Sequence, residues 1–135
     1  MSWDVIIISN KEAPEALTLD YVAPDWLPES MGDANFVRQA ISAALPDVDW
    51  SDPTYGAFYG EGFRLYFSVG EKSAINIMIW DIRGNGDPMP AIFHLCEQNG
   101  WAAYDANCNR RMTIDQAGDD WQNWKAYRDR VTEKG

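Results

Sequence analysis

Short blocks of apolar residues along the chain predict several β-strands. Residues 3–9 form a β-branched run that is typical of a buried strand. Residues 55–59 predict a short strand, and residues 63–69 alternate apolar and polar side chains as a strand that returns after a turn at residues 60–62. The longest candidate, residues 74–83, is apolar on both sides, so we expect a central strand that is covered, at least in part, on both faces.

Three segments show the spacing of an amphipathic helix. Asp33 can cap a helix over residues 34–45, with Phe36 in its apolar stripe. A second helix starts at Asp87-Pro88 and ends at Gly100, and a third starts near residue 120.

Two further strands complete the predicted order of elements. Residues 101–105 and 110–114 flank a turn, whereas residues 47–54 are rich in turn formers and residues 10–30 read as a long, proline-broken, acidic loop. Runs of strands favour an α+β fold over strict β–α alternation. We therefore expect one domain over residues 1–135, with a largely antiparallel sheet of about five or six strands packed against two or three helices.

Charge is distributed unevenly along the 135 residues. Residues 1–61 hold eleven carboxylates and two cations, a net charge of −9, whereas the remainder holds ten carboxylates and nine cations. Such an acidic half argues against nucleic-acid binding, which needs Lys and Arg against phosphates, and favours a cationic protein partner.

The sequence also bears on the compartment. No segment approaches the roughly 20 apolar residues of a membrane-spanning helix, so we expect no membrane association. The start of the chain lacks the basic and long apolar regions of a signal peptide, and this predicts a cytoplasmic protein.

Residue patterns for catalysis and metal binding are weak. His94 and Cys96 are two positions apart on the predicted second helix and therefore point in different directions. The turn at residues 84–88 has two glycines but lacks the Lys-Ser/Thr of a phosphate-binding loop. Residues 47–53 place Val and Trp among the carboxylates of a possible calcium loop. We expect no catalytic set, no metal and no cofactor.

Acidic side chains interleaved with Tyr and Trp are the strongest functional pattern. Aromatic side chains anchor protein interfaces, and carboxylates pair with Arg and Lys of a partner. The pattern occurs in the long acidic loop and again between the first predicted helix and the hairpin. The candidate partner-binding residues are Asp20, Tyr21, Asp25, Trp26, Glu29, Asp47, Asp49, Asp52, Tyr55, Tyr59 and Glu61.

Three stretches carry a resemblance to a known class of proteins: Trp3-Asp4-Val5, residues 40–70 and residues 79–104. With these, the chain resembles small stand-alone bacterial immunity proteins of polymorphic-toxin systems, including the partners of contact-dependent and type VI secreted effectors. Such proteins share a task rather than one fold, so no individual binding residue is transferred. The resemblance implies a tight, non-catalytic inhibitor of a cognate toxin with a basic active-site region.

Two alternatives remain open at this stage. The chain could be a small nucleotide- or metal-binding enzyme domain that uses the turn at residues 84–87, which a pocket with converging polar groups would favour. It could also be a structural adaptor without a toxin partner, which a toxicity-rescue assay would distinguish from an inhibitor.

Overall fold

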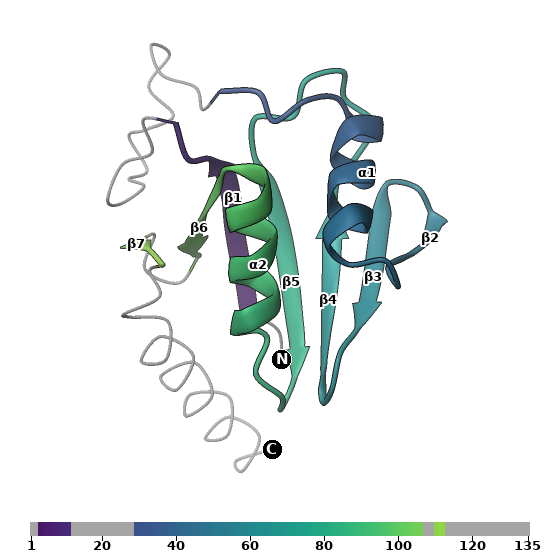
Figure 1. Ribbon diagram of the computed structural model, residues 1–135, viewed down its shortest axis with the longest axis vertical. Coiled ribbons are helices and arrows are strands. Elements are labelled where there is room, and N and C mark those ends of the chain that lie inside the picture. The colour runs from purple at the N-terminus through teal and green to yellow at the C-terminus, as the bar shows by residue number, and fades with distance from the viewer. Residues whose placement is uncertain (1–2, 12–28, 107–109, 113–135) are drawn as a thin grey trace.

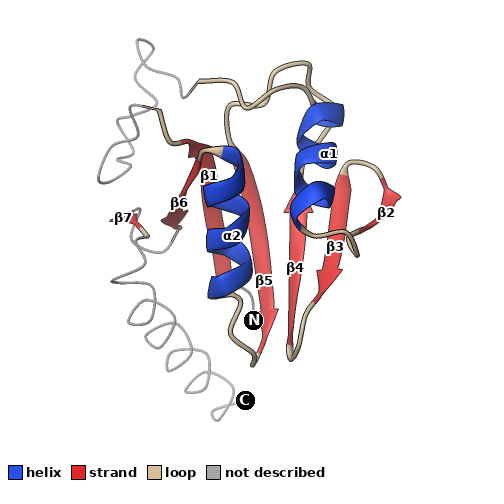
Figure 2. Ribbon diagram, viewed as in Figure 1, coloured by secondary structure: helices blue, strands red, loops and turns tan. Residues whose placement is uncertain are grey.

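The computed structural model describes residues 3–11, 29–106 and 110–112, and its centre is one antiparallel sheet (Figure 1). Within these ranges, seven strands follow the order β2-β3-β4-β5-β1-β6-β7, and two helices lie over the same face (Figure 2). The α+β prediction is confirmed, with more strands than expected. The elements are β1 (Trp3–Ser9), α1 (Ala34–Ala44), β2 (Asp49–Asp52), β3 (Tyr55–Tyr59), β4 (Phe63–Ser68), β5 (Met78–Gly84), α2 (Met89–Asn99), β6 (Trp101–Asp105) and β7 (Arg110–Arg111).

The main core lies between the sheet and the helices. Alternate side chains of β1, β4 and β5 point toward the helices, as the period of two in a strand requires. Trp80 of β5 is fully buried there and makes edge-to-face contacts with Phe67 and Trp101. The core also takes Val37 and Ile41 from α1.

Helix α1 begins at its predicted cap, Asp33, whereas α2 begins one residue later than predicted, with Pro88 at the cap position and Met89 as its first residue. The third predicted helix, near residue 120, lies outside the described residues. The Asp33 carboxylate accepts a hydrogen bond from the Phe36 backbone N–H at 2.7 Å, which caps α1. The Asp87 carboxylate accepts one from the Met89 N–H at 2.9 Å, and Gly100 ends α2 in the left-handed conformation. The predicted apolar stripe of α1 is too wide, however, because Phe36 is 59% exposed.

Strand β2 is an element that the sequence did not predict, since its residues looked like a turn. The structure pairs Asp49–Asp52 with β3, and Trp50 anchors the pair. The Trp50 indole N–H donates to the Ser42 hydroxyl at 2.8 Å, and a Cβ at Gly56 would lie only 2.6 Å from the Trp50 ring. Partial burial of this ring against α1 and β3 holds the short, polar strand at the edge of the sheet.

Strand β5 is central, as predicted, but it is shorter than the sequence pattern. It starts at Met78, because Ile75 instead exchanges backbone hydrogen bonds with the segment before α1, at Met31 and Gly32. The prediction of cover on both faces is wrong around Ile79. That side chain points away from the helices and is 47% exposed.

Candidate functional site

The face of the sheet opposite the helices carries the most unusual surface in the described part of the chain. We call the outward side chains of β3, β4, β5 and the start of β1 the open face. Five large apolar or aromatic side chains are exposed among the described residues, and all except Phe36 lie on or next to this face. These four are Tyr55, Tyr59, Ile77 and Ile79. Clustered exposure of this kind is typical of an interaction surface.

Two aromatic rings and one arginine form a stack on the open face. The Tyr55 and Tyr66 rings are parallel within 9°, with centroids 5.6 Å apart. The Arg83 guanidinium lies 5.5 Å from the Tyr66 centroid and donates to the Asp81 carboxylate at 3.1 Å. Partial burial, followed by the charge of Asp81, raises the pKa of Tyr55. These contacts hold the rings in place and give the open face a rigid aromatic centre.

Beside this stack, two carboxylates face each other across neighbouring strands. Asp4 of β1 and Asp81 of β5 are direct partners in the antiparallel register. Partial burial and then the charge of Asp81 raise the pKa of Asp4, against a weaker opposing effect of Arg83. Like charges in this arrangement destabilise a sheet.

One oxygen of Asp81 has no hydrogen-bond partner. Arg83 contacts Oδ2, whereas Oδ1 is shielded from water and accepts no hydrogen bond. A buried, unpartnered carboxylate oxygen lowers the free energy of unfolding. Two features at this place therefore lower the free energy of unfolding: the repulsion between Asp4 and Asp81, and the unpartnered oxygen.

The strand register places a third carboxylate in line with this pair. Asp4, Asp81, Tyr66, Ala57 and Asp49 are successive cross-strand partners from β1 to β2. At about 4.8 Å per strand, the row is about 19 Å long. A line of acidic positions, interrupted by an aromatic ring, thus crosses most of the open face.

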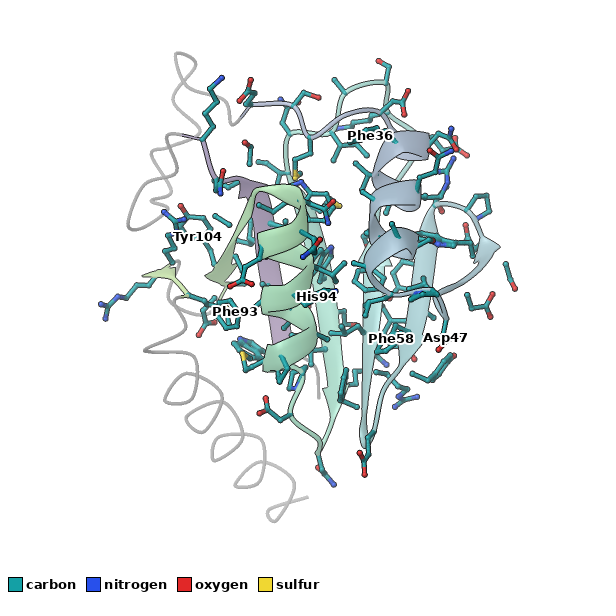
Figure 3. The ribbon with its side chains drawn as sticks, viewed as in Figure 1. Phe36, Asp47, Phe58, Phe93, His94 and Tyr104 are labelled. Atoms are coloured by element: carbon teal, nitrogen blue, oxygen red, sulfur yellow. The ribbon has the colours of Figure 1, made fainter. Side chains whose placement is uncertain are left out.

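The predicted partner-binding residues occupy several places. Asp47 lies in the turn between α1 and β2 (Figure 3), and Glu61 lies in the turn between β3 and β4. Glu29 lies 3.6 Å from the Lys11 ammonium, and both side chains are exposed. Asp49 and Asp52 lie on β2, and Tyr55 and Tyr59 lie on β3. Four predicted residues fall outside the described part of the chain: Asp20, Tyr21, Asp25 and Trp26.

Asp49, Asp52 and Tyr55 are brought together, because β2 pairs with β3. The Asp49 carboxylate accepts from the Ser51 hydroxyl at 2.6 Å and from its N–H at 2.8 Å. The Asp52 carboxylate accepts from the Thr54 hydroxyl at 2.7 Å and from its N–H at 2.9 Å. These hydrogen bonds, the side-chain ones first, lower the pKa of both exposed carboxyls. We call Asp47, Asp49 and Asp52 the acidic edge.

Several open-face residues did not emerge from the sequence as candidates. These residues are Asp4 on β1, Tyr66 on β4, and Ile79, Asp81 and Arg83 on β5. Strand β1 is far from the other two in the chain, and only the register brings Asp4 to Asp81. The alternation in residues 63–69 does place Tyr66 on the side away from the core. No local pattern predicts that Asp81 will face Asp4.

The candidate catalytic residues have ordinary structural positions. Cys96 is buried in the core, and this burial raises the pKa of its thiol to about 12, so the reactive thiolate is scarce. His94 is exposed on α2 (Figure 3). No cluster of three or more potential metal-binding side chains occurs in residues 3–11, 29–106 and 110–112.

The glycines at residues 84–86 allow two turns to pack closely. The backbone N–H groups of Asn85 and Gly86 both donate to the Gly62 carbonyl, at 2.9 and 2.7 Å. A Cβ at Gly86 would clash with the Glu61 carbonyl. These N–H groups are therefore used within the fold and do not form an open cradle for a phosphate.

Two surface hollows lie away from that turn. One, of about 310 Å³, is lined mainly by hydroxyl, amide and aromatic groups that include Ser9, Asn99 and Trp101. The other, of about 360 Å³, combines Asp33, Arg38, Glu71 and Lys72 with neighbouring polar residues. Neither hollow includes Cys96 or His94.

No protein-family model matches the chain, and no curated protein matches its sequence. In the described ranges, neither helix has the length and apolar character needed to cross a bilayer. The chemistry of the open face and the acidic edge is therefore the basis for a functional proposal.

Proposed function

We propose that this chain is an immunity protein that binds a cognate secreted bacterial toxin in the cytoplasm and covers its basic active-site region. The acidic edge and the aromatic side chains next to it form the contact. One observation carries the proposal: Asp49 and Asp52 are exposed, held by hydrogen bonds and favoured in the ionised form, beside exposed Tyr55.

Fixed carboxylates suit the inhibition of a cationic enzyme. Hydrogen bonds to Ser51 and Thr54 restrict the two side chains before binding, so less conformational entropy is lost in the complex. The nearby Arg38 guanidinium donates to the Pro53 carbonyl rather than to either carboxylate. Both charges thus remain accessible to lysine and arginine side chains of a partner, and they increase the rate of encounter.

The aromatic side chains supply the apolar part of the contact. Tyr59 is 63% exposed and lies on the same strand as Tyr55. The Tyr55 ring is held by stacking on the Tyr66 ring. Tyrosine side chains with few rotatable bonds are common anchors of protein interfaces. In this proposal the chain needs no catalytic group, because the contact itself blocks the toxin.

A rescue experiment tests the function directly. Each neighbouring gene that encodes a secreted protein is expressed alone, and one that proves toxic is co-expressed with this chain to compare growth. We expect the chain to restore growth through a stable complex. Toxicity that persists at high levels of the folded chain would refute the inhibitor proposal and favour a structural adaptor.

The acidic edge is tested by the double variant Asp49→Asn and Asp52→Asn. Asparagine keeps a side-chain oxygen for Ser51 and Thr54 but removes the charge. We expect slower association with the toxin and a weaker dependence of the rate on salt. Glu97→Gln is the control, because it removes the charge of an exposed side chain on α2, away from the acidic edge. Equal association rates in the wild type and the double variant would show that the acidic edge is not part of the contact with the toxin.

A further inference from the structure

We propose that the open face is the main docking surface for the toxin, and that an arginine of the toxin binds at the Asp4–Asp81 pair. This inference rests on the proposed function and extends the contact from the acidic edge to the centre of the sheet. The partner segment it implies is basic and partly apolar.

Charge complementarity supports a cationic occupant. The charged side chains of the open face and β2 in the described residues are Asp4, Asp49, Asp52 and Asp81 against Arg64 and Arg83, a net charge of −2. Arg83 already occupies Oδ2 of Asp81. Asp4 has no ion pair in the described structure, so a second guanidinium would complete this site.

The unpartnered oxygen shows where that guanidinium would act. Oδ1 of Asp81 accepts no hydrogen bond, although its side chain is 17% exposed. A small rotation of this side chain, together with the exposed Asp4 carboxylate opposite, would present two acceptors to one planar donor. The bound cation would remove the repulsion between the carboxylates.

The surroundings favour arginine over lysine. The Tyr66 ring lies between Tyr55 and Arg83, so the site borders an aromatic stack that already accommodates a guanidinium. Guanidinium is more weakly hydrated than ammonium and packs on aromatic faces. Exposed Ile79, next to Asp81 along the open face of β5, supplies an apolar contact for the stem of the side chain.

Titration of the whole protein with ethylguanidinium tests the site without the toxin. We expect changes in the backbone amide NMR signals of Asp4, Asp81 and Arg83, and smaller changes with ethylammonium. Asp4→Asn should weaken the binding by up to about fivefold, whereas Glu97→Gln should leave it unchanged. Signals that change only at β2, or equal affinity in Asp4→Asn, would overturn the inference.

A second variant separates this inference from the proposed function. Ile79→Lys places a positive charge at a half-exposed position of the open face, and a circular-dichroism melt verifies its fold. Loss of toxin neutralisation in this variant supports the docking surface. Full neutralisation by both Ile79→Lys and Asp4→Asn would refute the docking surface and leave the inhibitor proposal intact. Ethylguanidinium binding at Asp4 without any rescue by the wild type would refute the inhibitor proposal and leave only a guanidinium-binding site at the Asp4–Asp81 pair.

Discussion

The two faces of the sheet differ in how much of their apolar surface is buried. Toward the helices, Trp80, Ile82 and their neighbours are buried in one continuous core. On the open face, Ile79 is half exposed and Asp4 faces Asp81, although both features lower stability. The helix-covered face supplies the main core, and a smaller cluster around Ile8 and Tyr104 is buried on the opposite side of β1 and β6. We propose that the exposed features of the open face serve binding.

Replacement of a core side chain should give the largest effect and separate the two faces. Trp80→Ala removes a fully buried ring and should lower the free energy of unfolding by about 3–5 kcal/mol. Ile79→Ala on the same strand should lower it by less than about 1 kcal/mol, because that side chain is half exposed. Urea unfolding measures both values. Similar losses would contradict the division between the faces.

The carboxylate of Asp33, which caps α1, should stabilise the fold. Asp33→Ala removes the carboxylate that accepts the Phe36 N–H, and we expect a loss of about 1 kcal/mol in the same unfolding experiment. Asp33→Asn serves as the control, since asparagine also caps helices and should recover most of the loss. An unchanged free energy of unfolding in Asp33→Ala would show that the cap contributes little to the stability of α1.

Aspartate on the open face should have the opposite effect. Asp4→Asn removes the repulsion with Asp81 and should raise the free energy of unfolding at neutral pH by a few tenths of a kcal/mol to about 1 kcal/mol. A less stable variant would show that the Asp4 carboxylate makes a net favourable contribution.

The pH dependence of this gain follows from the direction of the pKa shift. The pKa of Asp4 is raised in the fold by partial burial and by Asp81, with Arg83 opposing, so ionisation of Asp4 costs stability. That cost is complete above the folded-state pKa and vanishes below the pKa of the unfolded chain. The advantage of Asp4→Asn should therefore shrink as the pH falls through the acidic range, as pH-dependent unfolding would show. A gain that grows on acidification would contradict this assignment.

The sequence predicted the elements better than the surface that they form. Alternation identified β4 and the apolar run identified β1, because local burial patterns leave a local signal. Strand β2 was missed, since the burial of Trp50 under α1 outweighs the turn-forming residues around it. Asp49 and Asp52 were recognised as candidates from their acidic, aromatic context.

The centre of the open face could not be predicted in the same way. Asp4 and Asp81 meet only through the β1–β5 register, and Tyr66 joins them through β4. Register depends on the packing of the whole sheet, which no single segment specifies. The exposure of Ile79 was likewise hidden, because an isoleucine in an apolar strand usually indicates cover on that side.

Neutralisation of the toxin by Asp4→Asn, measured beside its unfolding free energy, tests the account most directly. We expect Asp4→Asn to be more stable than the wild type and yet to require a higher concentration to neutralise the same amount of toxin. If Asp4→Asn is more stable and neutralises the toxin as well as the wild type does, the open face does not bind the toxin through Asp4.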